Sequence, residues 1–154
     1  MQYRRLGDTG IELPALSLGL ASHGGWRMGG TGEPYETPGR EAVLDLMRRA
    51  LDLGITVFDG APYYGETQKW IGEELRDRRH EIFLITKTQR RPYTRENLLE
   101  DIEGSLKDLR TDYADLFVVF NDAGTGQENV LEALRAVQES GKARYVGVTN
   151  WDGD

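Results

Sequence analysis

The chain has 154 residues, of which 38% are hydrophobic and 29% are charged. This length allows one domain with a buried core, and the composition is too apolar for a disordered protein. Lys and Arg number 19 against 26 for Asp and Glu, a net charge of −7, which argues against nucleic acid and membrane surfaces as partners because both attract clustered basic charge. The chain has no cysteine and only His23 and His80 as imidazole ligands, so disulfides and thiolate metal sites are excluded and we expect no metal.

The chain shows no targeting or membrane segment. Its first stretch, MQYRRLGDTG, lacks the apolar core of a signal peptide, and no apolar run reaches the length of a membrane span. No low-complexity linker divides the sequence. We therefore expect a cytoplasmic protein in which residues 1–154 form a single domain.

The first part of the chain carries turn signals and no helical period. The stretch GDTG at residues 7–10 predicts a tight turn between two short strands, and residues 15–20 are predicted to form a further strand. Residues 21–39 are glycine-rich and aperiodic, which predicts a long loop, and loops of this length are usually functional or mobile. Trp26 in this loop is a candidate for lining a substrate pocket, and packing on its own loop is an equal alternative.

From Arg40 onward, segments with helical spacing of apolar residues alternate with apolar runs typical of strands. The runs are nearly continuous in Val, Ile, Leu and Phe, as expected for parallel strands covered on both faces. This alternation predicts an α/β protein with a parallel sheet, either open or closed into a barrel. The predicted helices begin at Arg40, span residues 64–76, follow an N-cap at Thr94, and run from Val130 to a stop at Ser140 and Gly141; the predicted strands cover residues 55–59, 81–87, 112–120 and 143–149.

The positions of the polar residues favour the barrel. An open dinucleotide-binding sheet carries G-x-G-x-x-G after its first strand, and the glycines after Leu20 do not have that spacing. A barrel places its chemistry at the carboxyl ends of its strands. Polar side chains lie at or just beyond such ends here: Asp59, Lys87, Asn121, Thr149 and Asn150.

Five stretches together resemble the aldo-keto reductases, in matching order: YRRLGDTGIELPALSLGL, FDGAPYYG, LITKT, DYADLFVVF and GKARYVGVTNW. The resemblance covers essentially the whole chain. It implies a (β/α)8 TIM barrel with an N-terminal β-hairpin at its bottom. It also implies NADPH-dependent reduction of aldehydes and ketones to alcohols.

The resemblance further implies roles for individual residues. Asp59, Tyr64 and Lys87 match the family's catalytic Asp, Tyr and Lys. In that family the tyrosine gives a proton to the carbonyl oxygen as hydride arrives from the nicotinamide, and the Lys–Asp pair assists because a nearby cation favours phenolate. The residues implied in cofactor binding are Gly19, Asp59, Thr149 and Asn150.

The sequence departs from the family pattern at two positions of the site. The family's His falls on Phe120, which cannot donate a hydrogen bond to a substrate oxygen. The next residue, Asn121, could donate only if the end of its strand is bulged. The family's Thr after the catalytic Asp is Gly60 in this chain.

The length is a further departure. A (β/α)8 barrel has about 250 residues and at least about 200, whereas this sequence stops at Asp154, after the fifth predicted strand of the sheet. We therefore expect an incomplete barrel that lacks most contacts to the cofactor phosphates, so that NADPH binds these 154 residues weakly. The exposed edges of its first and fifth strands and an apolar inner face are predicted to promote self-association.

Structural roles compete with each assignment. Lys87 at a strand end can extend its amine to solvent, Asp59 can cap a helix, and Thr149 and Asn150 can be ordinary loop residues. Three functions therefore stay open: a reductase acting on a small carbonyl substrate, a non-catalytic binding or regulatory module of the same fold, and a piece that completes its barrel with another chain. NADPH binding distinguishes the first from the other two, and the mass in solution identifies the third.

Overall fold

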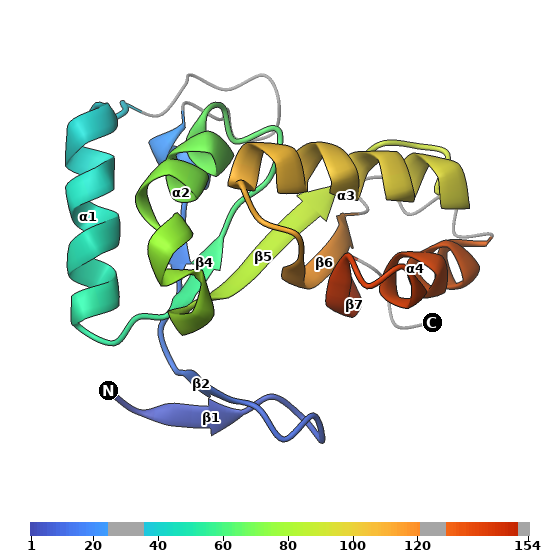
Figure 1. Ribbon diagram of the computed structural model, residues 1–154, viewed down its shortest axis with the longest axis horizontal. Helices are drawn as coiled ribbons and strands as arrows, with labels where there is room; N and C mark the ends of the chain where they lie inside the picture. Colours follow the sequence, from blue (N-terminus) through green and yellow to red (C-terminus); the bar gives the residue numbers. More distant parts are fainter. Residues whose placement is uncertain (25–35, 121–128, 151–154) are drawn as a thin grey trace.

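A computed structural model describes residues 1–24, 36–120 and 129–150 of the chain. A short antiparallel hairpin precedes a five-stranded parallel sheet, and the helices wrap around the outside of that sheet (Figure 1). Trp26 and Asn121, which the sequence singles out, lie outside the described residues. The predicted α/β alternation is confirmed, and the curved parallel sheet with helices outside it forms part of a barrel.

The N-terminal hairpin joins strands β1 (Tyr3–Arg5) and β2 (Glu12–Pro14), which pair antiparallel. The connection uses positive φ at Gly7 (51°) and Gly10 (78°), a conformation that glycine adopts without a steric penalty. The predicted turn at residues 7–10 is thus confirmed. In Figure 1 the hairpin lies below the sheet, apart from the helices.

Five parallel strands form the main sheet in the order β3-β4-β5-β6-β7. The first and last of them form its edges, as predicted. The strand predicted over residues 15–20 is too long: β3 contains only Leu18 and Gly19, which pair with Phe58 and Asp59 of the short strand β4. The bounds are Leu18–Gly19 (β3), Val57–Asp59 (β4), Phe83–Thr88 (β5), Ala114–Phe120 (β6) and Ala143–Thr149 (β7).

Helical segments return the chain between successive strands. Thr94 caps the helix that follows it, as predicted, because its side chain accepts a hydrogen bond from the Asn97 backbone N–H at 3.2 Å. The helices are η1 (a 3-10 turn, Ala21–His23), α1 (Arg40–Asp52), α2 (Thr67–Glu74), η3 (a 3-10 helix, Arg76–Glu81), α3 (Arg95–Leu109) and α4 (Val130–Glu139).

The helix predicted over residues 64–76 is wrong at both ends. It begins only at Thr67, because Gly65 has a φ of 65°, which is incompatible with a right-handed helix. Tyr64 therefore lies in the turn before α2 and does not start the helix. After α2 the chain tightens into η3, which delays the next strand to Phe83.

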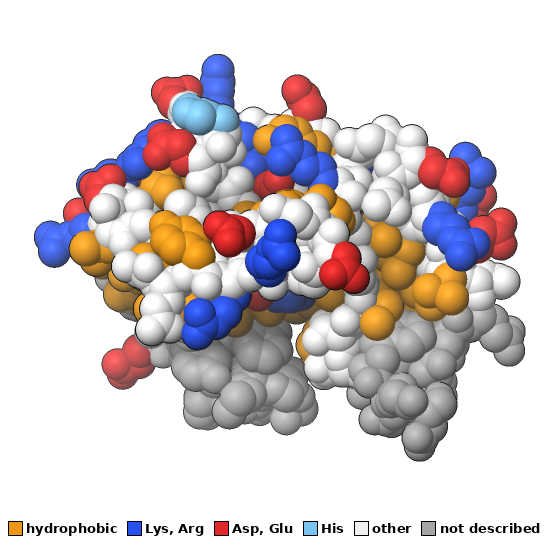
Figure 2. Space-filling model, turned by 90° about the horizontal axis from the view of Figure 1, so that it is seen from below, with side chains coloured by type: hydrophobic (Ala, Val, Ile, Leu, Met, Phe, Trp, Pro, Cys, Tyr) orange, Lys and Arg blue, Asp and Glu red, His pale blue; other side chains and the backbone are white. Residues whose placement is uncertain are grey.

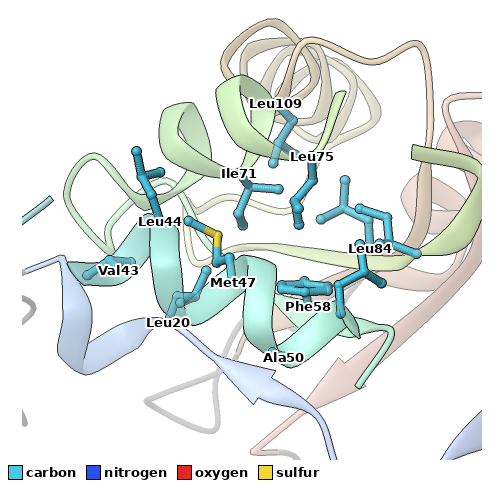
Figure 3. Packing of buried hydrophobic residues seen from close by; sticks show 12 residues of the cluster. Leu20, Val43, Leu44, Met47, Ala50, Phe58, Ile71, Leu75, Leu84 and Leu109 are labelled. Carbon is cyan, nitrogen blue, oxygen red and sulfur yellow. The ribbon is translucent and has the colours of Figure 1, made fainter. Parts of the chain in front are cut away.

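Outward-facing strand residues pack beneath the helices in two hydrophobic clusters. Phe58 and Leu84, paired across β4 and β5, belong to the first cluster under α1 and α2 (Figure 3). Phe117 on β6 belongs to the second, under α3 and α4. Phe58 is fully buried, and its replacement by Ala is expected to cost about 3–5 kcal/mol. Because side chains alternate along a strand, Asp59 and Lys87 point to the opposite, inner face of the sheet.

A charge cluster around a buried carboxylate ties together the amino ends of the strands. We call it the amino-end cluster; it consists of Asp115, Arg79, Arg144 and Tyr113. The Asp115 carboxylate accepts hydrogen bonds from Arg79 (2.7 Å), Arg144 (3.0 Å) and the Leu84 backbone N–H (2.9 Å). Both guanidinium groups lie over the Tyr113 ring, 4.0 and 4.3 Å from its centroid. In barrels this end of the strands serves stability, and the carboxyl end serves catalysis.

Charged side chains of both signs share the surface. The view from below shows Lys and Arg interspersed with Asp and Glu, with hydrophobic side chains between them (Figure 2). Charges of opposite sign therefore alternate over the described part of this face. Within the described ranges, no helix is both long and apolar enough to cross a membrane.

Candidate active site

The carboxyl ends of β4 and β5 bring three polar side chains together. Asp59 pairs with Ile85, and Lys87 lies two residues further along β5, so that it faces the same side. The Lys87 ammonium donates a hydrogen bond to Asp59 Oδ1 and another, at 3.2 Å, to the Tyr64 hydroxyl oxygen. The side chains of Lys87 and Asp59 are 12% and 29% exposed. The Lys87 ammonium is thus largely enclosed, and the group is most accessible to solvent at Asp59. The expected contacts among the three side chains are present, and their catalytic roles stay a prediction.

A tight turn between β4 and α2 places the Tyr64 phenol. The Gly60 N–H donates to Ile85 O at 3.0 Å, which ties the start of the turn to β5. The Tyr64 N–H donates to Ala61 O at 3.0 Å, and the Thr67 hydroxyl donates to Tyr64 O at 3.1 Å. Both backbone polar groups of Tyr64 are therefore bonded within the turn, so the phenol extends from a fixed backbone position.

A second loop packs against the same turn. Gly24, which follows η1, touches the backbone of Tyr64 and Gly65. A Cβ at Gly24 would lie 1.6 Å from the Tyr64 carbonyl oxygen, and a Cβ at Gly65 would lie 2.1 Å from Gly24 O. Neither position has room for a side chain. Nothing in the sequence distinguishes Gly24 from the other glycines of residues 21–39, so sequence reasoning misses it.

Aromatic rings line the site on the side of β6. The Tyr63 ring packs edge-on against the Tyr64 ring with centroids 5.0 Å apart, and the Phe120 ring lies 6.4 Å from the Tyr63 ring. The buried Tyr93 donates from its hydroxyl to Phe120 O at 3.2 Å, and Arg91 Nε donates to that hydroxyl, also at 3.2 Å. Phe120 thus lies at the carboxyl end of β6, beside the tyrosines of the turn. The sequence offers no signal for the support that Tyr93 and Arg91 give it.

The residues expected to bind a cofactor lie at the same edge of the sheet on different strands. Gly19 ends β3 and pairs with Asp59. Thr149 ends β7 and pairs with Phe120, and Asn150 follows it with a φ of 58°. Two strands, β5 and β6, lie between Asp59 and Thr149. The fold therefore places Gly19 beside the Asp59 group and sets Thr149 and Asn150 at the far edge.

Other cations near the turn are engaged in ion pairs at the surface. Lys69 on α2 donates to Glu66 at 2.8 Å, and this hydrogen bond raises the pKa of Lys69. Arg90 after β5 donates to Glu100 at 2.7 Å, and this contact raises the pKa of Arg90. Lys87 is the cation that lies against the phenol of the turn.

Known proteins share this arrangement of elements. A sequence model described as the Aldo/keto reductase family matches residues 21–154. Aldo-keto reductase YhdN of Bacillus subtilis is 34% identical, over 98% of this chain and 47% of its own length. A crystal structure of a thermostable aldo-keto reductase with the inhibitor epalrestat superposes with a TM-score of 0.84 at 35% identity, covering 99% of this chain and 55% of that one.

A crystal structure of an aldo-keto reductase from Klebsiella pneumoniae in complex with NADPH superposes with a TM-score of 0.78 at 25% identity, over 93% of this chain and 48% of that one. The chain thus spans about half the length of the proteins it matches.

Proposed function

Because the chain belongs to the aldo/keto reductase family, we propose that the protein reduces aldehydes or ketones to alcohols with NADPH as the hydride donor. The observation that carries the proposal is the contact of Lys87 with both Asp59 and Tyr64. It lies at the carboxyl ends of the strands, where barrel enzymes hold their catalytic residues.

Tyr64 is the proton donor in this reaction. A carbonyl oxygen held against its hydroxyl gains negative charge as hydride reaches the carbonyl carbon, and the phenolic proton moves to that oxygen. The C=O π bond is replaced by one C–H and one O–H bond, and the alcohol leaves. The Lys87 ammonium, 3.2 Å from the phenol oxygen, stabilises the phenolate that forms. Asp59 holds the ammonium in place, and a proton from solvent restores Tyr64.

The residues at the sheet edge fit the nicotinamide end of NADPH, which supplies the hydride when bound. Gly19 leaves a bare stretch of backbone, with no heavy atom within 4 Å of where its Cβ would be, on which a planar ring can lie. The Thr149 hydroxyl and the Asn150 amide can exchange hydrogen bonds with a carboxamide. Thr149 and Asn150 would therefore hold the carboxamide from the β7 edge, while Gly19 leaves room for the cofactor beside Asp59.

Two tyrosines provide a matched test. Tyr64→Phe removes the hydroxyl that Lys87 contacts, and Tyr113→Phe removes one in the amino-end cluster, at the opposite edge of the sheet. We expect Tyr64→Phe to lower kcat for aldehyde reduction by about 10³-fold, because it removes the proton donor, with the Kd of NADPH unchanged. Tyr113→Phe should keep the wild-type rate. The measurements are NADPH consumption and fluorescence titration, and a wild-type kcat in Tyr64→Phe would refute the assignment.

A non-catalytic binding module of the same fold is a second candidate. Phe120 favours it, because this residue offers no hydrogen bond to a substrate oxygen. This candidate predicts that no aldehyde is turned over and that wild type and Tyr64→Phe are indistinguishable.

A further inference from the structure

The carboxyl end of β5, which carries Lys87, extends beyond the neighbouring strand β4. Pairing between β4 and β5 runs as far as Ile85, and the Gly60 N–H then donates to Ile85 O. Lys87 and Thr88, by contrast, pair with β6 alone in the described part of the sheet. The segment that places the ammonium is therefore held by a neighbouring strand on one side.

A hydrogen bond from Thr88 to helix α3 holds this end of the strand from outside the sheet. Because side chains alternate along a strand, Thr88 points away from the Lys87 face, toward the helices, and it is 3% exposed. Its hydroxyl donates to Asp101 Oδ2 at 2.5 Å, and the Asp101 side chain is only 14% exposed. The bond thus joins the residue directly after Lys87 to the middle of a 15-residue helix.

The Asp101 carboxylate also fixes the loop that follows the strand. Its second oxygen accepts from the Arg90 guanidinium at 3.1 Å, and the Arg90 backbone N–H donates to the Thr88 hydroxyl oxygen at 3.1 Å. The same guanidinium donates to Asn97 (3.1 Å) and Glu100 (2.7 Å), which lie within about one turn of Asp101 on α3. These bonds form a closed network with partners on a rigid helix, so the end of β5 has one preferred position.

We propose that Asp101 is a positioning residue for the reduction, which acts through Thr88 to fix the end of β5. It thereby sets the distance between the Lys87 ammonium and the Tyr64 hydroxyl oxygen, which is 3.2 Å. The inference rests on the proposed function and adds to it two residues on the outer face of the sheet. A misplacement of about 1 Å can lower kcat by about 10²-fold, so loss of the Thr88–Asp101 bond should impair the chemical step and leave binding unchanged.

The experiment uses the protein as encoded in its gene and measures kcat and KM for propanal and benzaldehyde, the Kd of NADPH, and the folded fraction by circular dichroism. Thr88→Val removes the hydroxyl and keeps the shape of the side chain. It should lower kcat of the folded protein by about tenfold, with KM and Kd unchanged. Thr88→Ser keeps the hydroxyl and should restore the wild-type kcat.

A second variant tests whether Thr88 and Asp101 act through one bond. Asp101→Ala removes the acceptor of that bond and should lower kcat at least as far as Thr88→Val. The double variant should then be no slower than Asp101→Ala alone, because both changes remove the same interaction. Losses of kcat that add in the double variant would overturn the positioning role.

Thr86→Val is the matched control on the same strand and the same face. Thr86 is also buried and directly follows the residue that β4 still pairs; its hydroxyl accepts from Gln68 at 2.6 Å and donates to Ser105 at 3.3 Å. Its loss should lower stability and keep kcat.

Three further results would overturn the positioning role: wild-type kcat in Thr88→Val, a Thr88→Ser variant as slow as Thr88→Val, or an equal loss of kcat in Thr86→Val. A wild type that reduces no aldehyde would instead overturn the proposed function, and this inference with it.

Discussion

An acid, a cation and a tyrosine meet at both ends of the same sheet, and their surroundings differ. At the amino end, Asp115 is 3% exposed and bonded by Arg79, by Arg144 and by a backbone N–H. At the carboxyl end, Asp59 is 29% exposed, and Lys87 contacts only the side chains of Asp59 and Tyr64 among the hydrogen bonds of the described residues.

The difference lies in how fully each set of hydrogen bonds is satisfied within the protein. Arg79 also donates to the carbonyl oxygens of Ile82 (3.0 Å) and Tyr113 (2.9 Å), so its charge is tied to the backbone of neighbouring segments. Such a buried and saturated pair resists change, because removal of one partner leaves an uncompensated charge. At the other end, the Tyr64 hydroxyl oxygen accepts a hydrogen bond from Lys87 beside the partly exposed Asp59. The same residue types therefore stabilise the fold at one edge and can do chemistry at the other.

The largest effects are expected when each aspartate is exchanged for asparagine: a loss of stability at the amino end and a loss of activity at the carboxyl end. Asp115→Asn is expected to lower the free energy of unfolding by about 3–5 kcal/mol, because Arg79 loses its buried counter-charge, while kcat of the folded fraction is kept. Asp59→Asn should lower stability less than Asp115→Asn, because the Asp59 side chain is 29% exposed against 3% for Asp115. It should lower kcat by about 10²-fold, because Lys87 loses its anchor.

Urea denaturation and NADPH consumption measure both quantities in each aspartate variant. The exposed neighbour Asp112→Asn serves as a control and should change stability by less than about 0.5 kcal/mol. The contrast between the two ends fails if Asp59→Asn is the more destabilising of the two variants.

Gly24→Ala tests whether the carboxyl-end group depends on backbone support. The added Cβ would lie 1.6 Å from the Tyr64 carbonyl oxygen, so the turn must shift. A displacement of about 1 Å at a catalytic group can lower kcat by about 10²-fold, and the Kd of NADPH should stay the same. Gly104→Ala on α3, where no heavy atom lies within 4 Å of the new Cβ, is the matched control and should keep full activity. Wild-type kcat in Gly24→Ala would show that Tyr64 does not need this contact.

A third and smaller effect is expected from an ion pair that belongs to neither end. In η3, Arg78 donates to Glu81 at 2.8 Å, and this hydrogen bond lowers the pKa of Glu81 from its ordinary 4.5. A carboxyl whose pKa is lowered in the folded state stabilises the protein above its unfolded pKa and loses that contribution as the pH falls through the folded value. Urea midpoints at neutral and acidic pH should therefore differ less in Arg78→Gln than in wild type. Arg76→Gln, a nearby exposed substitution, should keep the wild-type pH dependence.

Local signals in the sequence were sufficient for much of the fold. Apolar spacing and caps predict the helix that starts at Arg40 and the capped helix after Thr94, and the stretch ARYVGVT predicts β7 with its observed bounds. These features depend on neighbouring residues, through backbone hydrogen bonds and side-chain periodicity. Strand alternation also places Asp59 and Lys87 on one face, because parallel neighbours share an edge.

Contacts between distant segments decided the rest. The strand predicted over residues 15–20 is limited to the two residues that pair with the short strand β4, and the helix predicted from Tyr64 starts later because Gly65 adopts a positive φ against Gly24. The support of Phe120 by Tyr93 likewise joins a loop to a strand end that is distant in sequence. No local pattern encodes such contacts, because they arise only when packing of the helices on the sheet brings the two backbones together. Tertiary packing therefore determines which tyrosine, glycine and acid become the site.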